Sequence, residues 1–229
     1  ILESKRFTCS NIDEYKNLDT ILHLTCEHGH HIDAALKTVR NANFRCPYCA
    51  GNESVSDKLN GIEPPLKSGF RIIAIDNATE NAGLSIFDDG KLVFYHLFHF
   101  EGDLIGRIMK NKNLIKDIII GKWQPDLLVL EDIQQQVNVM VFKSLAMLLG
   151  NALVVARESG VKTETVLSKV WRAHYMIPGR TRAEQKAGAI QKVKEMYGVT
   201  LGDDIAEAIL MGKYAADVLT RQELRKKLF

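Results

Sequence analysis

The sequence predicts an α/β protein in which a mixed sheet flanked by helices follows a small cysteine-containing module. Two observations predict this organisation. All 4 cysteines lie within the first 50 residues, and none occurs after Cys49. From residue 70 onward, short apolar runs alternate with longer segments whose apolar residues recur at helical spacing. We therefore expect a module at residues 1–51, a linker at 52–68 and a larger domain at 69–229.

The composition is that of an ordinary folded protein. With 46% hydrophobic and 25% charged residues among 229, intrinsic disorder and collagen-like structure are excluded. We expect no membrane association and a cytoplasmic location, because no apolar run approaches the ~20 residues of a membrane-spanning helix. The net charge of +2 does not indicate a polyanion binder by itself. Residues 157–197, however, carry nine basic and four acidic side chains, net +5, and could face phosphates.

The cysteine spacing predicts a structural zinc site. Cys46 and Cys49 form a Cys-x-x-Cys turn, which presents two thiolates to one metal ion, and Cys9 and Cys26 complete a tetrahedral set. In so small a module the metal would supply much of the folding free energy. A disulfide is disfavoured because no export signal opens the sequence, and a redox motif would normally open a helix after a strand.

The identity of the fourth zinc ligand stays open at this point. His28, His30 and His31 follow Cys26 closely, and one of these imidazoles could replace Cys9. The cysteines, together with the Gly-His pair, resemble the zinc-ribbon modules of phage and mobile-element proteins. In that pattern the histidine of the pair, here His30, is usually structural. Residues 32–40 are expected to form a short helix between the ligand pairs.

The larger domain is predicted to order its elements as β-β-β-α-β-α-β-α-α. Strands are expected at residues 70–75, 83–87, 91–100, 127–130 and 163–167, and helices at 103–119, 139–159, 182–197 and 203–219. The helix at 139–159 is apolar on nearly every face, which is expected where a helix is covered on two sides. One of the covers could be a second subunit.

Carboxylates follow two strands and open the last helix. Asp76 ends the first strand and Glu131 ends the fourth, while Asp204 and Glu207 are three residues apart and share one helical face. If the two strands are parallel neighbours, their ends place both acids in one crevice. Taken singly, such acids are more often helix caps or loop residues. Four together would repel one another unless divalent cations bind them.

Oxygen ligands without thiols favour Mg²⁺ or Mn²⁺ over softer metals. Two such ions about 3.5 to 4 Å apart are the device for in-line phosphodiester hydrolysis. One ion activates the attacking water and the other stabilises the leaving oxygen. The carboxylates therefore predict a metal-dependent phosphodiester hydrolase.

Three acidic segments resemble those of the RuvC family of Holliday junction resolvases, closest to the phage type. They are Ile73-Ala74-Ile75-Asp76-Asn77-Ala78-Thr79-x-x-x-Gly83, Leu127-Leu128-Val129-Leu130-Glu131 and Asp204-Ile205-Ala206-Glu207-Ala208-Ile209. The resemblance implies an RNase H-like fold and a homodimeric endonuclease that makes paired nicks in four-way DNA junctions. It implies two Mg²⁺ or Mn²⁺ per active site on Asp76, Glu131, Asp204 and Glu207, and a dimer helix at 139–159. A role in DNA recombination and repair follows, in the host cytoplasm if a phage encodes the protein.

The sequence also departs from the family. Glu207 stands where members usually have a second Asp, and Asn77-Ala78 replaces a Pro-Gly or Pro-Ser pair. Residues 134–136, all glutamine, replace an aromatic side chain that is thought to wedge the junction. The zinc module lies outside the bacterial pattern, and we interpret it as an added element that binds DNA or supports the dimer.

The basic stretch is expected to bind phosphates of the DNA backbone. The DNA-binding residues that we predict are Lys169, Arg172, Arg180, Arg182 and Lys186. Lys169 also matches a family lysine near the active site, which implies a catalytic contact.

Two other functions compete with the nuclease. One is a non-catalytic, zinc-dependent DNA-binding protein on a degenerate nuclease fold, against which the retention of all four acids argues. The other is an actin-like ATPase, which shares the strand order. That fold needs a second glycine-rich phosphate loop, and the sequence has none.

Overall fold

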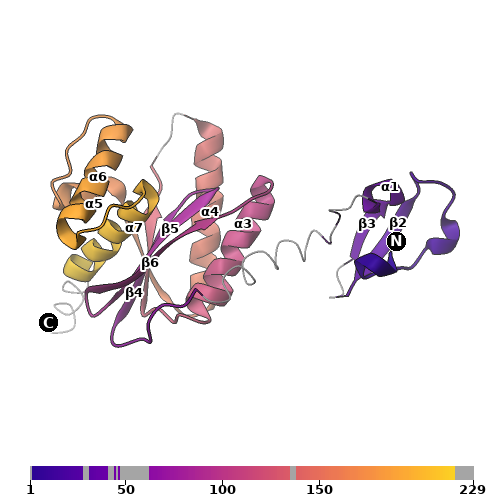
Figure 1. Cartoon of the computed structure of the whole chain (residues 1–229), viewed down its shortest axis with the longest axis horizontal. Helices are drawn as coiled ribbons and strands as arrows, with labels where there is room; N and C mark the ends of the chain where they lie inside the picture. Colours follow the sequence, from indigo (N-terminus) through magenta and orange to yellow (C-terminus); the bar gives the residue numbers. More distant parts are fainter. Residues whose placement is uncertain are drawn as a thin grey trace. The chain divides into compact units, whose positions relative to one another are not determined.

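The computed structural model divides the chain into two compact units, Ile1–Lys58 and Leu59–Phe229 (Figure 1). The structure describes residues 2–27, 31–40, 44, 46, 62–134 and 138–219. Cys49, His28 and His30 lie outside the described residues, as do Gln135 and Gln136.

The described part of the smaller unit is built on an antiparallel sheet in the order β1-β2-β3. Its elements are η1 (Glu3–Lys5), β1 (Phe7–Cys9), η2 (Ile12–Glu14), β2 (Ile21–Cys26), β3 (His31–Ala35) and α1 (Leu36–Val39). Burial alternates along β2, so that Leu22 and Leu24 enter a small core with Phe7 and Val39.

The helix predicted at residues 32–40 was wrong in its first half. His31–Ala35 pairs with β2, from Thr25 opposite His31 to Ile21 opposite Ala35, and the helix is confined to Leu36–Val39. Pairing satisfies the backbone donors and acceptors of β2 on its second side, a long-range gain that local spacing does not reveal.

The larger unit has a mixed sheet in the order β6-β5-β4-β7-β8, which confirms the predicted fold class. Its strands are β4 (Arg71–Asn77), β5 (Asn81–Asp88), β6 (Lys91–His99), β7 (Leu127–Asp132) and β8 (Lys162–Leu167). β4 and β5 are antiparallel, as are β5 and β6, whereas β7 runs parallel to both β4 and β8. The register sets Ile75 opposite Leu130, so the ends of β4 and β7 lie side by side.

Helices cover both faces of this sheet (Figure 1). On one side lie α3 (Leu104–Asn113), its continuation η3 (Leu114–Ile120) and α4 (Val139–Glu158). On the other side lie α5 (Ser168–His174), α6 (Arg182–Tyr197), α7 (Asp203–Tyr214) and its continuation η4 (Ala215–Leu219). The helix α5 was not predicted from the sequence. It is short, and Trp171, which is 1% exposed, anchors it to the core.

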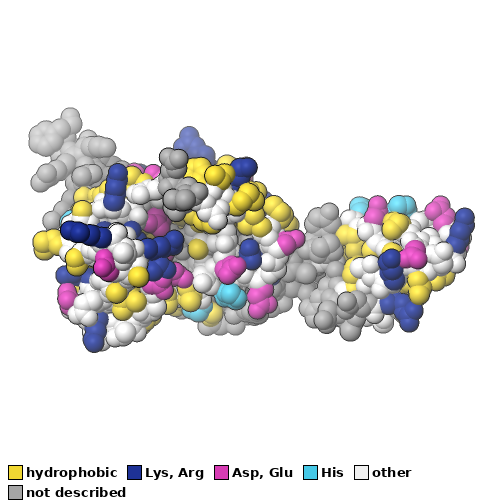
Figure 2. Space-filling model, turned by 90° about the horizontal axis from the view of Figure 1, so that it is seen from above, with side chains coloured by type: hydrophobic (Ala, Val, Ile, Leu, Met, Phe, Trp, Pro, Cys, Tyr) yellow, Lys and Arg dark blue, Asp and Glu magenta, His cyan; other side chains and the backbone are white. Residues whose placement is uncertain are grey.

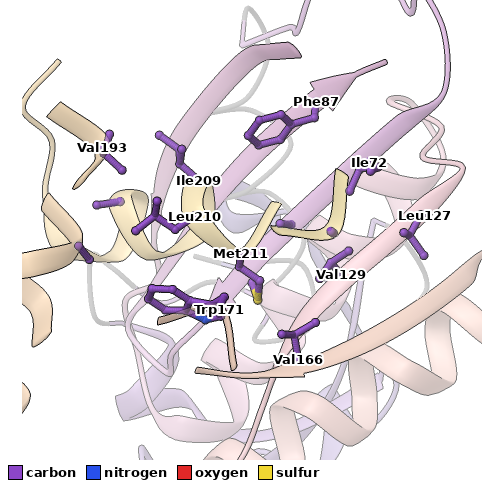
Figure 3. Close-up of a cluster of buried hydrophobic side chains, with 14 residues drawn as sticks. Ile72, Phe87, Leu127, Val129, Val166, Trp171, Val193, Ile209, Leu210 and Met211 are labelled. Carbon is purple, nitrogen blue, oxygen red and sulfur yellow. The ribbon is translucent and has the colours of Figure 1, made fainter. Parts of the chain in front are cut away.

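The core beneath α7 shows how strand alternation leads to the pocket described below (Figure 3). Ile72 and Ala74 of β4, with Leu127 and Val129 of β7, pack against Ile209, Leu210 and Met211 of α7. Successive side chains of a strand point to opposite faces, so the next residue on this face is Asp76 in β4 and Glu131 in β7. The apolar core therefore passes directly into carboxylates at the strand ends.

A buried ion pair fastens residues 62–68, the described part of the predicted linker, to the sheet. Arg71 donates to both carboxylate oxygens of Asp88, at 2.7 and 2.6 Å, and each residue is 2% exposed. Burial would raise the pKa of Asp88, but the donors of Arg71 and Ser68 lower it on balance. Arg71 Nη2 also donates to the carbonyl oxygen of Pro65 at 2.8 Å.

The helix α4 is covered along only part of its surface. Leu148, Ala152, Val155 and Ala156 are buried, whereas Met147 and Val154 are 45% and 55% exposed. By length and composition alone α4 could cross a membrane, and 22% of its apolar 18-residue stretch is buried inside the structure. The expectation of no membrane association and a cytoplasmic location stays a prediction. A single helix of this kind is weak evidence, so α4 by itself places the chain in no membrane.

Candidate active site

The four predicted catalytic carboxylates line one pocket of about 490 Å³. Asp76 enters from the end of β4 and Glu131 from the end of β7. Asp204 and Glu207 enter from the first turns of α7. The parallel pairing of β4 with β7 and the i, i+3 spacing on α7 bring together residues that lie 131 positions apart at most, from Asp76 to Glu207.

Gly83 of β5 permits the approach of α7. It lies opposite Asp76 in the register, and a Cβ atom built on it would stand 2.0 Å from the carbonyl oxygen of Asp204. Two residues along the same face, Ser85 Oγ donates to the carbonyl oxygen of Ala208 at 2.7 Å. The first turns of α7 thus rest directly on the backbone of β5.

Acidic residues outnumber basic residues in the lining of the pocket. Asp132 lines it besides the four predicted acids, and the cationic lining residues are Arg172 and Arg182. Burial raises the pKa of Asp76 well above its ordinary value, and the nearby carboxylates of Glu131, Glu207 and Asp204 raise it further. Burial also raises the pKa of Glu207, against the opposing effect of Arg172.

The donor set fits a hard divalent cation in its chemistry, because it offers carboxylate oxygens and no thiol. Among the described residues, however, no group of three or more His, Cys, Asp or Glu side chains is arranged to hold a metal ion. Two cations of the chain contact acids in the first turns of α7. Arg172 Nη2 lies 2.5 Å from Glu207 Oε1, and Lys186 contacts Asp203 and lies 3.9 Å from Asp204 Oδ1.

The predicted DNA-binding residues are divided between the pocket and its surroundings. Arg172 and Arg182 line it, whereas Lys186 is held by Asp203 at the start of α7. Lys169 is exposed and follows Ser168, which lines the pocket, but Lys169 itself does not line it. Arg180 is exposed just before α6. Figure 2 shows Lys and Arg side chains beside Asp and Glu side chains on the larger unit.

Sequence reasoning missed several polar residues of the pocket. Asp132, Ser168 and Gln185 also line it. Asn77 lines it as well and exchanges two amide hydrogen bonds with Asn111 of α3, at 3.3 and 2.6 Å. Asp132 could have been inferred from its place beside Glu131. Asn111, the partner of Asn77, could not have been inferred, because a single Asn within a helical pattern does not indicate a hydrogen-bond partner.

In the smaller unit, Cys26 and Cys46 are buried in the core and Cys9 packs against it. Cys9 Sγ donates to Asn11 Oδ1 at 3.4 Å. His31, one alternative zinc ligand, bonds Thr25 at 3.0 Å. Thr25 lies between Leu24 and Cys26 on β2, so its side chain points to the other face of the sheet. The zinc site stays a prediction, since Cys49 lies outside the described residues.

We expect Gly83→Ala to lower the free energy of unfolding by about 1–3 kcal/mol, because the new methyl group would press α7 off β5. Urea denaturation measures this. The matched control is Gly150→Ala, made on α4 where nothing lies within 4 Å of the added Cβ atom. It should be neutral or stabilising by up to about 1 kcal/mol. Equal stability of Gly83→Ala and wild type would show that the close approach is not required.

Comparisons with known proteins support the fold. No known family model and no curated protein matches the sequence. Thermus thermophilus RuvC in complex with a Holliday junction substrate aligns with a TM-score of 0.54 at 14% identity, over 66% of this chain and 96% of RuvC. Thermus thermophilus RuvC in a second structure gives 0.53 at 16% identity, over 67% and 96%. The yeast mitochondrial Holliday junction resolvase Ydc2 gives 0.46 at 14% identity, over 72% and 89%. The two RuvC alignments show that the chain has an RNase H-like α/β fold similar to that of RuvC.

Proposed function

We propose that the chain is a structure-selective DNA endonuclease that resolves four-way junctions by paired, metal-dependent phosphodiester hydrolysis. The observation that carries the proposal is the convergence of Asp76, Glu131, Asp204 and Glu207 on one pocket. The fold is that of RuvC, and one of the similar RuvC structures was solved with a Holliday junction substrate. The setting we propose is recombination in a phage or mobile element.

The pocket offers groups suited to both sides of a phosphodiester. Two Mg²⁺ or Mn²⁺ ions on the carboxylates would activate water and neutralise the leaving oxygen. Arg172 and Arg182 line the same pocket, and a guanidinium group matches the geometry of phosphate oxygens. Gln185 accepts a hydrogen bond from Arg172 Nη1 at 3.2 Å and limits the rotation of that side chain.

Exposed cations outside the pocket would hold the flanking DNA. Lys169 and Arg180 are exposed near the ends of α5 and α6. Contacts of this kind bind the backbone without reading the sequence, and their contribution falls as salt is raised. The proposed substrate is thus branched DNA that is recognised by its shape.

Asp76→Asn should abolish junction cleavage while DNA binding persists. Loss of a metal ligand removes several kcal/mol of transition-state stabilisation, which corresponds to a rate at least about a thousandfold slower. The measurement is cleavage of a labelled four-way junction beside a matched linear duplex, in Mg²⁺ or Mn²⁺. Wild type should place symmetric nicks in the junction alone.

The control for Asp76→Asn is Glu101→Gln, which makes the same carboxylate-to-amide change at an exposed position that does not line the pocket. It should cleave as wild type does. Junction binding by wild type without cleavage in either metal would refute the nuclease and favour a DNA-binding protein. The absence of both junction binding and cleavage would instead favour the actin-like ATPase.

We also infer that the chain acts as a homodimer through α4. Met140, Met147 and Val154 recur every seven residues on this helix and are 65%, 45% and 55% exposed. Residues at this spacing form one stripe along a helix. Paired nicks in one junction need two pockets, which a symmetric pair of chains would supply.

Val154→Glu should convert the dimer into a monomer, because a charge on the stripe would have to be buried in the interface. Light scattering coupled to size-exclusion chromatography measures the mass. Met176→Glu, at a residue 85% exposed after α5, makes a comparable change on the other side of the sheet and should leave the dimer intact. A monomeric wild type at micromolar concentration would contradict the proposed interface.

The smaller unit is proposed to bind one Zn²⁺ through Cys9, Cys26, Cys46 and Cys49. The support comes from the placement of Cys9, Cys26 and Cys46 in and against one small core. Four thiolates around one zinc form a closed, structural site. The module would then be an added element that binds DNA or supports the dimer.

The wild-type chain should contain one zinc per molecule, and Cys46→Ser should contain little, because a three-thiolate site binds the ion far less tightly. Elemental analysis of the purified proteins measures the content. His31→Gln is the control and should keep its zinc, since that imidazole bonds Thr25. Zinc-free wild type, or loss of zinc in His31→Gln, would refute this ligand set.

A further inference from the structure

Arg172 is held in the pocket by three different contacts. Its Nη2 lies 2.5 Å from Glu207 Oε1, and its Nη1 donates to Gln185 Oε1 at 3.2 Å. The guanidinium carbon lies 4.8 Å from the centre of the Trp171 ring. The side chain is 18% exposed, so solvent screens these contacts only weakly. The guanidinium group therefore places a permanent positive charge inside the pocket.

Glu207 is an enclosed partner for this charge. Its residue is 6% exposed, and an ionised carboxylate so little hydrated needs a counter-charge. Arg172 supplies that charge at hydrogen-bond distance. The other predicted ligand on α7, Asp204, has its nearest lysine at 3.9 Å, which is a much weaker contact.

We propose that Arg172 is a built-in counter-ion, which occupies Glu207 in the metal-free protein and which a divalent cation displaces from it. The inference rests on the proposed function, because it takes Glu207 to be a metal ligand. A divalent cation and a guanidinium on the same buried carboxylate would repel each other strongly. Metal binding at Glu207 and the Arg172–Glu207 contact therefore compete with each other.

The displaced guanidinium could bind a phosphate group in the same pocket. Arg172 lines the pocket itself, and its Nε is buried without a hydrogen-bond partner among the described residues. An arginine can offer Nε and one terminal nitrogen together to a single phosphate. Filling the metal site would thus free a phosphate-binding group beside it.

The first test is the affinity for Mg²⁺, measured by calorimetry on the full chain as purified. Arg172→Gln removes the competing cation and should bind Mg²⁺ about tenfold more tightly than wild type. Arg157→Gln makes the same change at an exposed position of α4 that does not line the pocket, and it should change the affinity by less than about twofold. In a Glu207→Gln background, Arg172→Gln should lose its effect.

The calorimetry distinguishes failure of the counter-ion role from failure of the proposed nuclease. Unchanged or weaker Mg²⁺ binding by a folded Arg172→Gln would overturn the counter-ion role, while the proposed nuclease would stand. An equal gain in the Glu207→Gln background would also overturn it, because the competition would not act through Glu207. Absence of Mg²⁺ binding in every protein would remove the metal-dependent function and this inference with it.

A second measurement needs no variant of Arg172. The chain has 2 tryptophans, and Trp171 lies under the guanidinium whereas Trp123 packs against Phe94, 5.7 Å between ring centres. In ¹⁵N-labelled wild type, the indole signal of Trp171 should shift along with Mg²⁺ occupancy, and that of Trp123 should not. Trp171→Phe assigns the two signals. A Trp171 signal that stays still at saturating Mg²⁺ would overturn the displacement.

Discussion

The pocket depends on the contact between α7 and β5 at Gly83. The carbonyl oxygen of Asp204 occupies the space of a missing side chain there, so the helix meets the strand backbone directly. β4 lies beside β5, with Asp76 opposite Gly83 in the register. Any larger residue at position 83 would separate the carboxylates of the sheet from those of the helix. One glycine thus joins two parts of the site that the chain encodes far apart.

Local periodicity was enough to predict the strands of the larger sheet and the positions of Asp76 and Glu131 at two strand ends. Alternation along β4 and β7 turns Asp76 and Glu131 to the face of Ile72 and Val129, and strand order then makes them neighbours. Residues 31–35 escaped prediction because their strand exists through pairing with β2. The contact of Arg172 with Glu207, 35 positions away, could not be predicted for the same reason. The charge composition of a segment does not indicate which residues form ion pairs.

The internal pairing of basic residues changes how the charge of the sequence should be interpreted. Residues 157–197 carry a net +5, yet two of their cations are engaged by acids of α7. Arg172 contacts Glu207, and Lys186 contacts Asp203. A cation held by a carboxylate adds little to the attraction of a distant polyanion. The field that DNA would meet is therefore weaker than composition suggests, and exposed residues such as Lys169 account for more of it.

The helix α4 connects the proposed assembly with the proposed chemistry. Its first turns, at Met140, Val141 and Ser144, line the pocket, and the exposed apolar stripe begins at the same Met140. A second chain covering that stripe would fix the helix that forms one wall of the pocket. Burial of the stripe lowers the free energy of the dimer through the hydrophobic effect. This stabilisation does not depend on bound DNA. Association would thus order the pocket wall before any substrate arrives, and two pockets would then face one junction with a fixed separation.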